Sequence, residues 1–168
     1  VLRKHQIPMV LEGPNYIYVD EKDFADDPYV IYLRNELGEN LKSITGTAQY
    51  EVNKLSAELG NADVELVRKE LGTEFDMIVH EPDGILEIGQ AGHSKASGIE
   101  RLCASLGIAK EDTYAFGDSA NDVEMLEFVA HGIAMGNGTD VAKNAAEFVT
   151  TDIHKDGIWN GLKHYGLI

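Results

Sequence analysis

The fold is decided by the stretch Thr113-Tyr114-Ala115-Phe116-Gly117-Asp118-Ser119-Ala120-Asn121-Asp122. Its first four residues are typical of a short buried strand, and Gly117 then allows a tight turn. Residues 122–130 have the pattern of a helix, so an acidic loop joins the strand to the helix that follows. In open α/β sheets, ligands bind outside the carboxyl ends of the strands, and Asp118 occupies that position.

The rest of the second half alternates between strand and helix patterns, which indicates βαβ units and a parallel sheet. The patterns predict helices over residues 94–106, 122–130 and 140–146, and strands over residues 113–116, 132–135 and 148–150. Ser94 is a plausible N-cap of the first of these helices, and Gly107 is its stop. Trp159, Leu162 and Tyr165 indicate a C-terminal helix that docks on the sheet.

The first half has the pattern of strands and short helices that is typical of a small α+β layer. We expect a hairpin of residues 9–11 and 16–19, a strand over 43–47 that ends in a turn around Gly46, and strands over 75–80 and 85–88 around the turn Pro82-Asp83-Gly84. We expect helices over residues 51–59 and 64–71. Residues 21–28 are either an acidic linker or a short helix stopped by Pro28, and residues 30–33 fit a strand or a helix. The domain boundary is expected near residues 86–92, which divides the chain into residues 1–86 and 87–168.

The charge and the apolar runs of the sequence argue against two classes of partner, nucleic acids and membranes. Fourteen basic and 29 acidic residues give a net charge of −15, which argues against a nucleic-acid partner. A small phosphate ligand remains compatible with this charge, because a bound divalent cation reverses the local sign. No apolar run approaches the ~20 residues that span a bilayer, so we expect no membrane partner.

The single cysteine, Cys103, rules out an intramolecular disulfide, and we expect a cytoplasmic protein. Cys103 shares a predicted apolar helix face with Ile99, Leu102 and Leu106. We therefore expect a buried structural thiol.

Three polar side chains follow the strand that precedes Gly117. Asp118, Asn121 and Asp122 bring two carboxylates and an amide to one loop, a donor set that suits Mg²⁺. The alternative is structural: Asp118 or Ser119 caps the next helix, and the helix dipole favours Asp122. Spacing alone leaves both interpretations open. The EF-hand template does not fit, because its glycine and terminal glutamate are absent.

Two further motifs were weighed in the same way. Lys95 adds positive charge to a predicted helix start, which suits an anion such as phosphate, although a solvated surface lysine is the plainer alternative. Residues 134–139 end a strand in a glycine-rich turn, but Val141 stands where a dinucleotide fingerprint needs its third glycine. We therefore expect a flexible turn there. The six histidines form no metal-ligand pattern.

These motifs, taken in order, resemble the haloacid dehalogenase (HAD) superfamily and, within it, the Cof-type phosphatases. The resemblance rests on Gly92-His93-Ser94-Lys95, on residues 117–126, on Ala134-Met135-Gly136-Asn137, and on Val149-Thr150 and Asp156-Gly157. It implies an α/β fold, with the C-terminal part of a HAD-like Rossmannoid core with parallel strands and most of an α+β cap domain. The specific motifs cover roughly the C-terminal half.

The resemblance also implies a Mg²⁺-dependent phosphohydrolase acting on small phosphorylated metabolites such as sugar phosphates. Carried over, Lys95 holds phosphoryl oxygens, Asn121 contacts the phosphate and Asp118 ligates Mg²⁺. Asp122 orients the metal shell or the lysine and counts among the metal-site residues. Lys95, Asp118 and Asp122 are then the catalytic set.

The chain departs from the family pattern in one large respect. The Asp-x-Asp-x-Thr motif that carries the family's nucleophile occurs nowhere in residues 1–168. Residues 20–23 and 23–26 are not substitutes, because they lack the spacing and the preceding buried strand. Ala96 and Gly138 are minor departures. We therefore expect the C-terminal portion of such an enzyme, with a non-catalytic domain that binds Mg²⁺ or phosphate, or an interaction module, as the alternative.

The missing aspartate leads to a prediction for this chain as it stands. Metal and lysine polarise a phosphate but cannot form an aspartyl-phosphate, so the purified 168 residues should not hydrolyse a generic phosphate monoester. The strand at 113–116 should have an unpaired edge, which favours self-association or association with the N-terminal portion. Substantial Mg²⁺-dependent turnover by the 168 residues alone would reveal a nucleophile within them.

Overall fold

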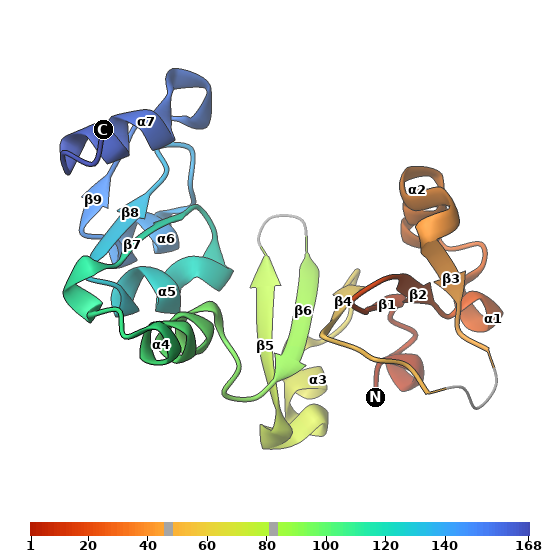
Figure 1. Cartoon of the computed structure of the whole chain (residues 1–168). Coiled ribbons are helices and arrows are strands. Elements are labelled where there is room, and N and C mark those ends of the chain that lie inside the picture. The colour runs from red at the N-terminus through yellow and green to blue at the C-terminus, as the bar shows by residue number, and fades with distance from the viewer. Residues whose placement is uncertain (46–48, 81–83) are drawn as a thin grey trace. The chain divides into compact units, whose positions relative to one another are not determined.

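The computed structural model of the chain describes residues 1–45, 49–80 and 84–168 (Figure 1). It divides into two compact units, Val1–Ala91 and Gly92–Ile168. The division lies within the expected window of residues 86–92, but residues 87–91 belong to the first unit, because the last strand of that unit continues to Gln90. Among the described residues, no helix has the length and apolar character to cross a membrane.

The first unit contains a six-stranded sheet in the order β3-β2-β1-β4-β6-β5. Its strands are β1 (Met9–Glu12), β2 (Ile17–Val19), β3 (Leu41–Ser43), β4 (Lys54–Glu58), β5 (Phe75–His80) and β6 (Ile85–Gln90). Only β2 and β3 run parallel; the other neighbours are antiparallel. The hairpin of β1 and β2 and the pair β5–β6 confirm the sequence prediction, as do the bounds of β5.

Helices cover both faces of this sheet. They are α1 (Glu21–Phe24), α2 (Pro28–Leu37) and α3 (Val64–Leu71), with single turns η1 (Leu2–His5), η2 (Gly38–Asn40) and η3 (Gly72–Glu74). Adjacent residues of β1 point to opposite faces: Met9 packs on a cluster with Val67 of α3, and Val10 packs with Val30 of α2. The unit therefore has two apolar cores, one on each side of the sheet.

Residues 51–59 are not a helix, which corrects the prediction from sequence. Val52, Leu55 and Leu59 have helical spacing, yet residues 54–58 form β4. Leu55 pairs with Leu11 of β1 on one side and with Ile88 of β6 on the other. Two neighbouring strands supply the backbone hydrogen bonds of this segment, and this tertiary pairing outweighs a short-range periodicity.

Pro28 begins a helix and does not stop one. The Asp27 side chain accepts a hydrogen bond from the Tyr29 N–H at 2.9 Å, and proline occupies the first helical position, where its missing N–H costs nothing. Residues 30–33 are accordingly helical, within α2, and α1 occupies part of the expected linker. The expected strand over 43–47 is wrong in its bounds, because β3 covers Leu41–Ser43 and residues 44–45 are not part of a strand. The turns around Gly46 and at Pro82-Asp83 lie outside the described residues.

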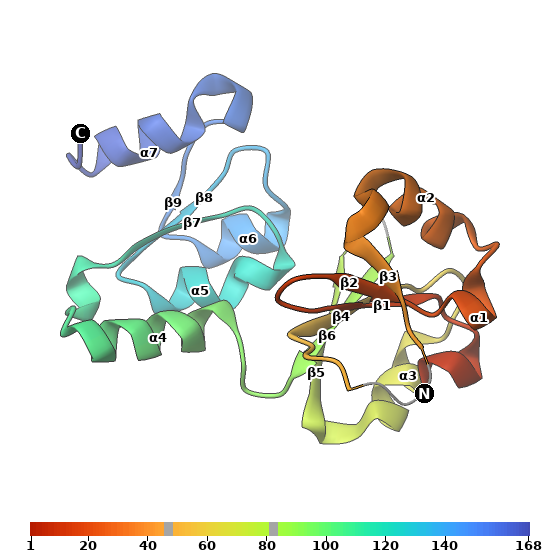
Figure 2. The same cartoon turned by 45° about the vertical axis from the view of Figure 1, so that its right-hand side comes forward.

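The second unit is a parallel three-stranded sheet in the order β7-β8-β9, as the βαβ pattern predicts. Its strands are β7 (Tyr114–Gly117), β8 (His131–Ala134) and β9 (Phe148–Val149). Its helices are α4 (Lys95–Leu106), α5 (Val123–Phe128), α6 (Asp140–Ala145) and α7 (Gly157–His164), with single turns η4 (Lys110–Asp112), η5 (Ala120–Asp122) and η6 (Ile153–Lys155). Figure 2 shows α7 on one side of this sheet and α5 and α6 on the other. Within the described residues β7 pairs only with β8, so its other edge is unpaired, as expected.

The predicted limits of α4 are confirmed. Ser94 and Ser97 form a reciprocal capping box at its start, and Gly107 ends it in the left-handed conformation, with φ +68°. The expected burial of its apolar face is wrong: Cys103 is only half-buried, and Leu102 and Leu106 are 55% and 63% exposed. Periodicity places these side chains on one face, but burial requires a second element over the whole of that face. Among the described residues α5 packs against α4 and still leaves Leu102 and Leu106 exposed.

Two close approaches hold helices on the sheet of the second unit. A Cβ added at Gly161 of α7 would lie 2.5 Å from the Phe116 ring, so this helix docks on the sheet as predicted. A Cβ added at Gly132 of β8 would lie 2.3 Å from the backbone oxygen of Leu126 in α5. Backbone cannot give way as a side-chain tip can, so Gly132 lets α5 approach β8.

We expect Gly132→Ala to lower the free energy of unfolding by about 2 kcal/mol, because the added methyl group forces the α5 backbone away from β8. Gly98→Ala in α4 is the matched control. Open space surrounds Gly98, and alanine should stabilise the helix by roughly 0.5–1 kcal/mol. Urea denaturation followed by circular dichroism measures both changes. Equal effects of the two substitutions would contradict this account.

Candidate active site

Four polar side chains meet where β7 ends. Asp118 follows the last residue of β7, the turn η5 carries Asn121 and Asp122, and Lys95 opens α4. The Lys95 ammonium donates a hydrogen bond to Asp122 Oδ1 and lies 3.5 Å from Asn121 Oδ1. Residues 26 and 27 positions apart in the sequence thus form one cluster, because the carboxyl end of a strand and the amino end of a helix lie together.

Asp122 is the buried centre of this cluster, at 3% exposure. Its Oδ2 accepts hydrogen bonds from the N–H groups of Asp118 at 2.9 Å and Ser119 at 3.3 Å, and its Oδ1 accepts from Lys95. Gly117 makes room for it, since a Cβ there would lie 2.6 Å from the Asp122 Cβ. Both carboxylate oxygens are therefore engaged in holding the loop and the lysine.

The charge of Asp122 is set by opposing influences. Burial by itself raises the pKa of the Asp122 carboxyl, while the hydrogen bond from Lys95, the two backbone N–H donors and the lysine charge lower it. The net result is a pKa below the ordinary value. Asp122 is thus ionised at neutral pH and fixes the ammonium group opposite it.

Lys95 is neither a buried lysine nor a freely solvated one. Its side chain is 49% exposed, while its ammonium is tied to a carboxylate that is 5% exposed. An ammonium carries three protons, and two of them face Asp122 and Asn121. The third remains for a ligand, at the amino end of α4 where the helix dipole also favours an anion.

Asp118 differs from Asp122 in its surroundings. Its side chain is exposed, and within the described residues no hydrogen bond or ion pair engages its carboxylate. Its backbone oxygen accepts hydrogen bonds from Thr139 N–H at 2.8 Å and Thr139 Oγ1 at 3.3 Å. The loop that carries Asp118 is therefore held in place while its carboxylate stays available to a cation.

The glycine-rich turn at 134–139, expected to be merely flexible, is part of this architecture. A Cβ at Gly138 would lie 3.0 Å from the Asp118 backbone oxygen, so the turn packs directly on the acidic loop. Thr139, which no sequence motif indicated, joins the turn to the acidic loop through its hydrogen bonds to the Asp118 oxygen. Its only sequence signal was its position next to the glycines.

The donor set fits a magnesium ion at Asp118 in part. No group of three or more histidine, cysteine or acidic side chains gathers to hold a metal anywhere in the described portion of the chain. Asp118 offers one unengaged carboxylate, the hard oxygen ligand that Mg²⁺ prefers, and Mg²⁺ usually keeps several waters. Both Asp122 oxygens already accept hydrogen bonds, so Asp118 is the more accessible metal ligand and Asp122 lies beside the lysine.

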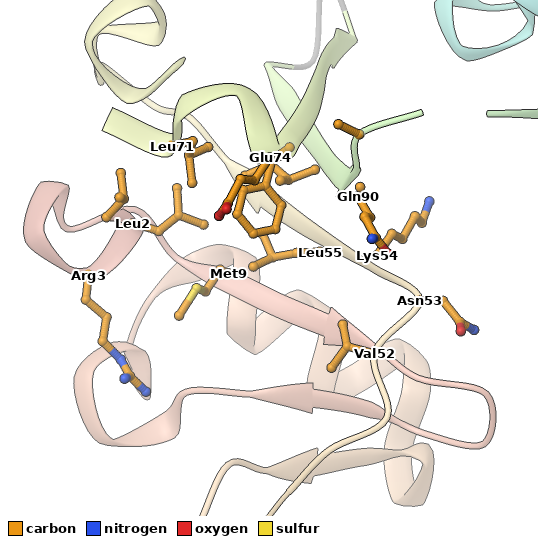
Figure 3. A pocket seen from close by; sticks show the side chains of 15 residues that line it. Leu2, Arg3, Met9, Val52, Asn53, Lys54, Leu55, Leu71, Glu74 and Gln90 are labelled. Atoms are coloured by element: carbon orange, nitrogen blue, oxygen red, sulfur yellow. The ribbon is translucent and has the colours of Figure 1, made fainter. Parts of the chain in front are cut away.

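A groove of about 860 Å³ lies apart from this cluster, entirely in the first unit. Its lining is mostly apolar, and Figure 3 shows Leu2, Met9, Leu55 and Leu71 around it, whereas Arg3 points away from them. It contains none of the candidate residues. The polar cluster at the end of β7, which holds the charged and amide side chains, is therefore the candidate active site.

Comparisons with known proteins agree with this geometry. The model of the haloacid dehalogenase-like hydrolases matches residues 1–162. An uncharacterised protein in the pdhA 5′ region of Geobacillus stearothermophilus is 54% identical over 78 residues, which are 46% of this chain and 82% of that protein. The 5-amino-6-(5-phospho-D-ribitylamino)uracil phosphatase YitU of Bacillus subtilis is 36% identical over 138 residues, 79% of this chain and 47% of the relative.

Among solved structures, a sugar phosphatase of HAD subclass IIB superposes with a TM-score of 0.77 at 24% identity, over 99% of this chain and 64% of the other. The chain thus spans about half of YitU and two thirds of the solved relative. The likeness in fold covers both units, and the family model covers nearly all of the sequence. This chain therefore belongs to the haloacid dehalogenase-like hydrolases, with phosphatases among its relatives.

Proposed function

We propose that this chain supplies the phosphate-holding and metal-holding residues of a Mg²⁺-dependent phosphatase that acts on small phosphorylated metabolites. The observation that carries the proposal is the Lys95–Asp122 pair, which fixes a half-exposed ammonium beside the Asn121 amide at the carboxyl end of β7. YitU is named as a phosphatase of a phosphorylated ribityl compound, and a solved neighbour is a sugar phosphatase. Both names support a phosphorylated polyol or sugar as substrate.

Each residue has a distinct task in this proposal. Lys95 binds a phosphoryl oxygen and offsets the negative charge that develops during transfer, an effect that is strong where the donor is held in advance. Asn121 donates a second hydrogen bond to the phosphate. Asp122 is a positioning residue, because both of its oxygens accept hydrogen bonds from Lys95 and the loop backbone.

Asp118 would hold the magnesium ion through its exposed carboxylate. When bound, the ion supplies positive charge for the phosphoryl oxygens. The loop backbone keeps this carboxylate in place through the hydrogen bonds of Thr139 to the Asp118 oxygen. Lys95 and Asp118 would thus share the neutralisation of the substrate phosphate.

A second candidate function follows from the missing Asp-x-Asp-x-Thr motif in residues 1–168. Without an attacking carboxylate the chain would be a domain that binds Mg²⁺ or phosphate and does not hydrolyse phosphate esters. The sequence of the full-length protein discriminates between the two. An Asp-x-Asp-x-Thr segment upstream of Val1 supports the phosphatase, and its absence supports the binding domain.

The first test is substitution at the two exposed charges of the site. In the full-length protein, Asp118→Ala and Lys95→Ala should each lower kcat/KM for p-nitrophenyl phosphate with Mg²⁺ by about 100-fold or more. Asp118→Ala should leave the fold intact, because this side chain is exposed. Glu111→Ala, which removes an exposed acid in the turn η4 before β7, is the control and should change nothing. Near-normal turnover by both site variants would contradict the assignment of Asp118 and Lys95 to the active site.

The lowered pKa of Asp122 leads to a prediction about stability against pH. A carboxyl group whose pKa falls on folding stabilises the protein above its ordinary pKa of 3.8, and the contribution is lost as the pH falls through the folded value. Wild type should therefore exceed Asp122→Asn by about 2 kcal/mol in unfolding free energy above roughly pH 5, and the gap should shrink below 3.8. Urea titrations at several pH values measure it, with Asp112→Asn as the exposed control. A gap that widens in acid would refute this role.

A further inference from the structure

The side-chain oxygen of Asn121 faces two donors. The Ser119 hydroxyl lies 2.8 Å from Asn121 Oδ1, and the Lys95 ammonium lies 3.5 Å from the same atom. An ammonium can only donate, so the Lys95 contact requires the amide oxygen on its side, whereas a hydroxyl can donate to an amide oxygen or accept from an amide N–H. Lys95 therefore assigns the orientation of the Asn121 amide, and the Ser119 hydroxyl donates to the same oxygen.

This orientation has a chemical consequence. Within the described residues the Asn121 Nδ2 group has no hydrogen-bond partner, so two N–H donors remain for a ligand. A reversed amide would present oxygen lone pairs to a phosphate oxygen, and the two would repel each other. Asn121 is a phosphate donor only in the orientation that Lys95 sets and that the Ser119 hydrogen bond holds in place.

Ser119 makes the shorter of the two contacts and holds the Asn121 side chain in place. The Lys95 contact is at the outer limit of a hydrogen bond, whereas the Ser119 contact has the length typical of a hydroxyl donor. Ser119 is itself held, because its backbone N–H donates to the buried Asp122 carboxylate at 3.3 Å. With the Asn121 oxygen set on this side by Lys95, the Ser119 hydroxyl donates its single proton to that oxygen.

We infer that Ser119 is a positioning residue for phosphate, which acts by fixing the amide of Asn121 with its N–H groups toward the ligand. The inference rests on the proposed function, since it names the device that prepares the same site. The competing role is a plain helix cap, in which Ser119 serves the turn η5 and has no influence through Asn121.

A double-mutant cycle separates the two roles. The variants are Ser119→Ala, Ser119→Thr, Asn121→Ala and the double variant Ser119→Ala/Asn121→Ala, all in the full-length protein. The probe is inorganic phosphate with Mg²⁺, titrated by NMR, and KM and kcat for p-nitrophenyl phosphate are measured alongside. Free energies of unfolding are determined for every variant.

Ser119→Ala should weaken phosphate binding by about 2- to 10-fold and raise KM similarly with little change in kcat, because the contact serves ground and transition states alike. Ser119→Thr keeps the hydroxyl and should restore binding. In the Asn121→Ala background, Ser119→Ala should have no further effect on phosphate binding. A helix cap would instead lower stability equally in both backgrounds.

An equal loss of phosphate affinity from Ser119→Ala with and without Asn121 would overturn the inference, as would undiminished affinity in Ser119→Ala itself. The proposed function has a separate readout. If wild type binds phosphate without hydrolysing the monoester, the phosphatase proposal fails, while the coupling between Ser119 and Asn121 in phosphate binding still decides the role of Ser119.

Discussion

The ion pair between Lys95 and Asp122 is the interaction on which the second unit depends. It joins the first residue of α4 to the loop after β7, and the same carboxylate holds that loop through two backbone N–H groups. A buried carboxylate needs such partners, because burial without them is costly. The requirement extends to Gly117, whose missing side chain leaves space for Asp122. One buried charge thus explains a glycine, a lysine at an unusual helix position and the shape of the loop.

The same interaction reconciles an acidic protein with an anionic ligand. The net charge of −15 repels phosphate at a distance, yet the cluster at the end of β7 presents hydrogen-bond donors. The negative charge of Asp122 is offset by Lys95 and by the backbone N–H groups that bind it, so it does not repel an anionic ligand directly. Asp118 is the exposed negative group, and a bound cation would convert it from a repulsive group into an attractive one.

The two units bury their apolar side chains in different ways. In the first, α2 and α3 cover opposite faces of one sheet and produce two apolar cores. In the second, glycines at 132 and 161 let helices lie close against a small parallel sheet. Among the described residues, Leu102 and Leu106 of α4 and the free edge of β7 remain uncovered. These surfaces show that apolar periodicity reports which side chains share a face, and only a neighbouring element decides whether that face is buried.

Short-range chemistry made much of this protein predictable from its sequence. The βαβ alternation, the caps Ser94 and Gly107, and the bounds of α3 and β5 depend on neighbours in the chain, and the structure has them as expected. The strand β4 could not be foreseen, because its partners β1 and β6 lie far away in sequence and overrule a helical spacing. The motifs located the polar residues at the end of β7 but left two tasks for Asp122 open. Its hydrogen bonds favour one of them, since only the folded chain brings Lys95, 27 residues away, against a carboxylate whose other oxygen is already engaged.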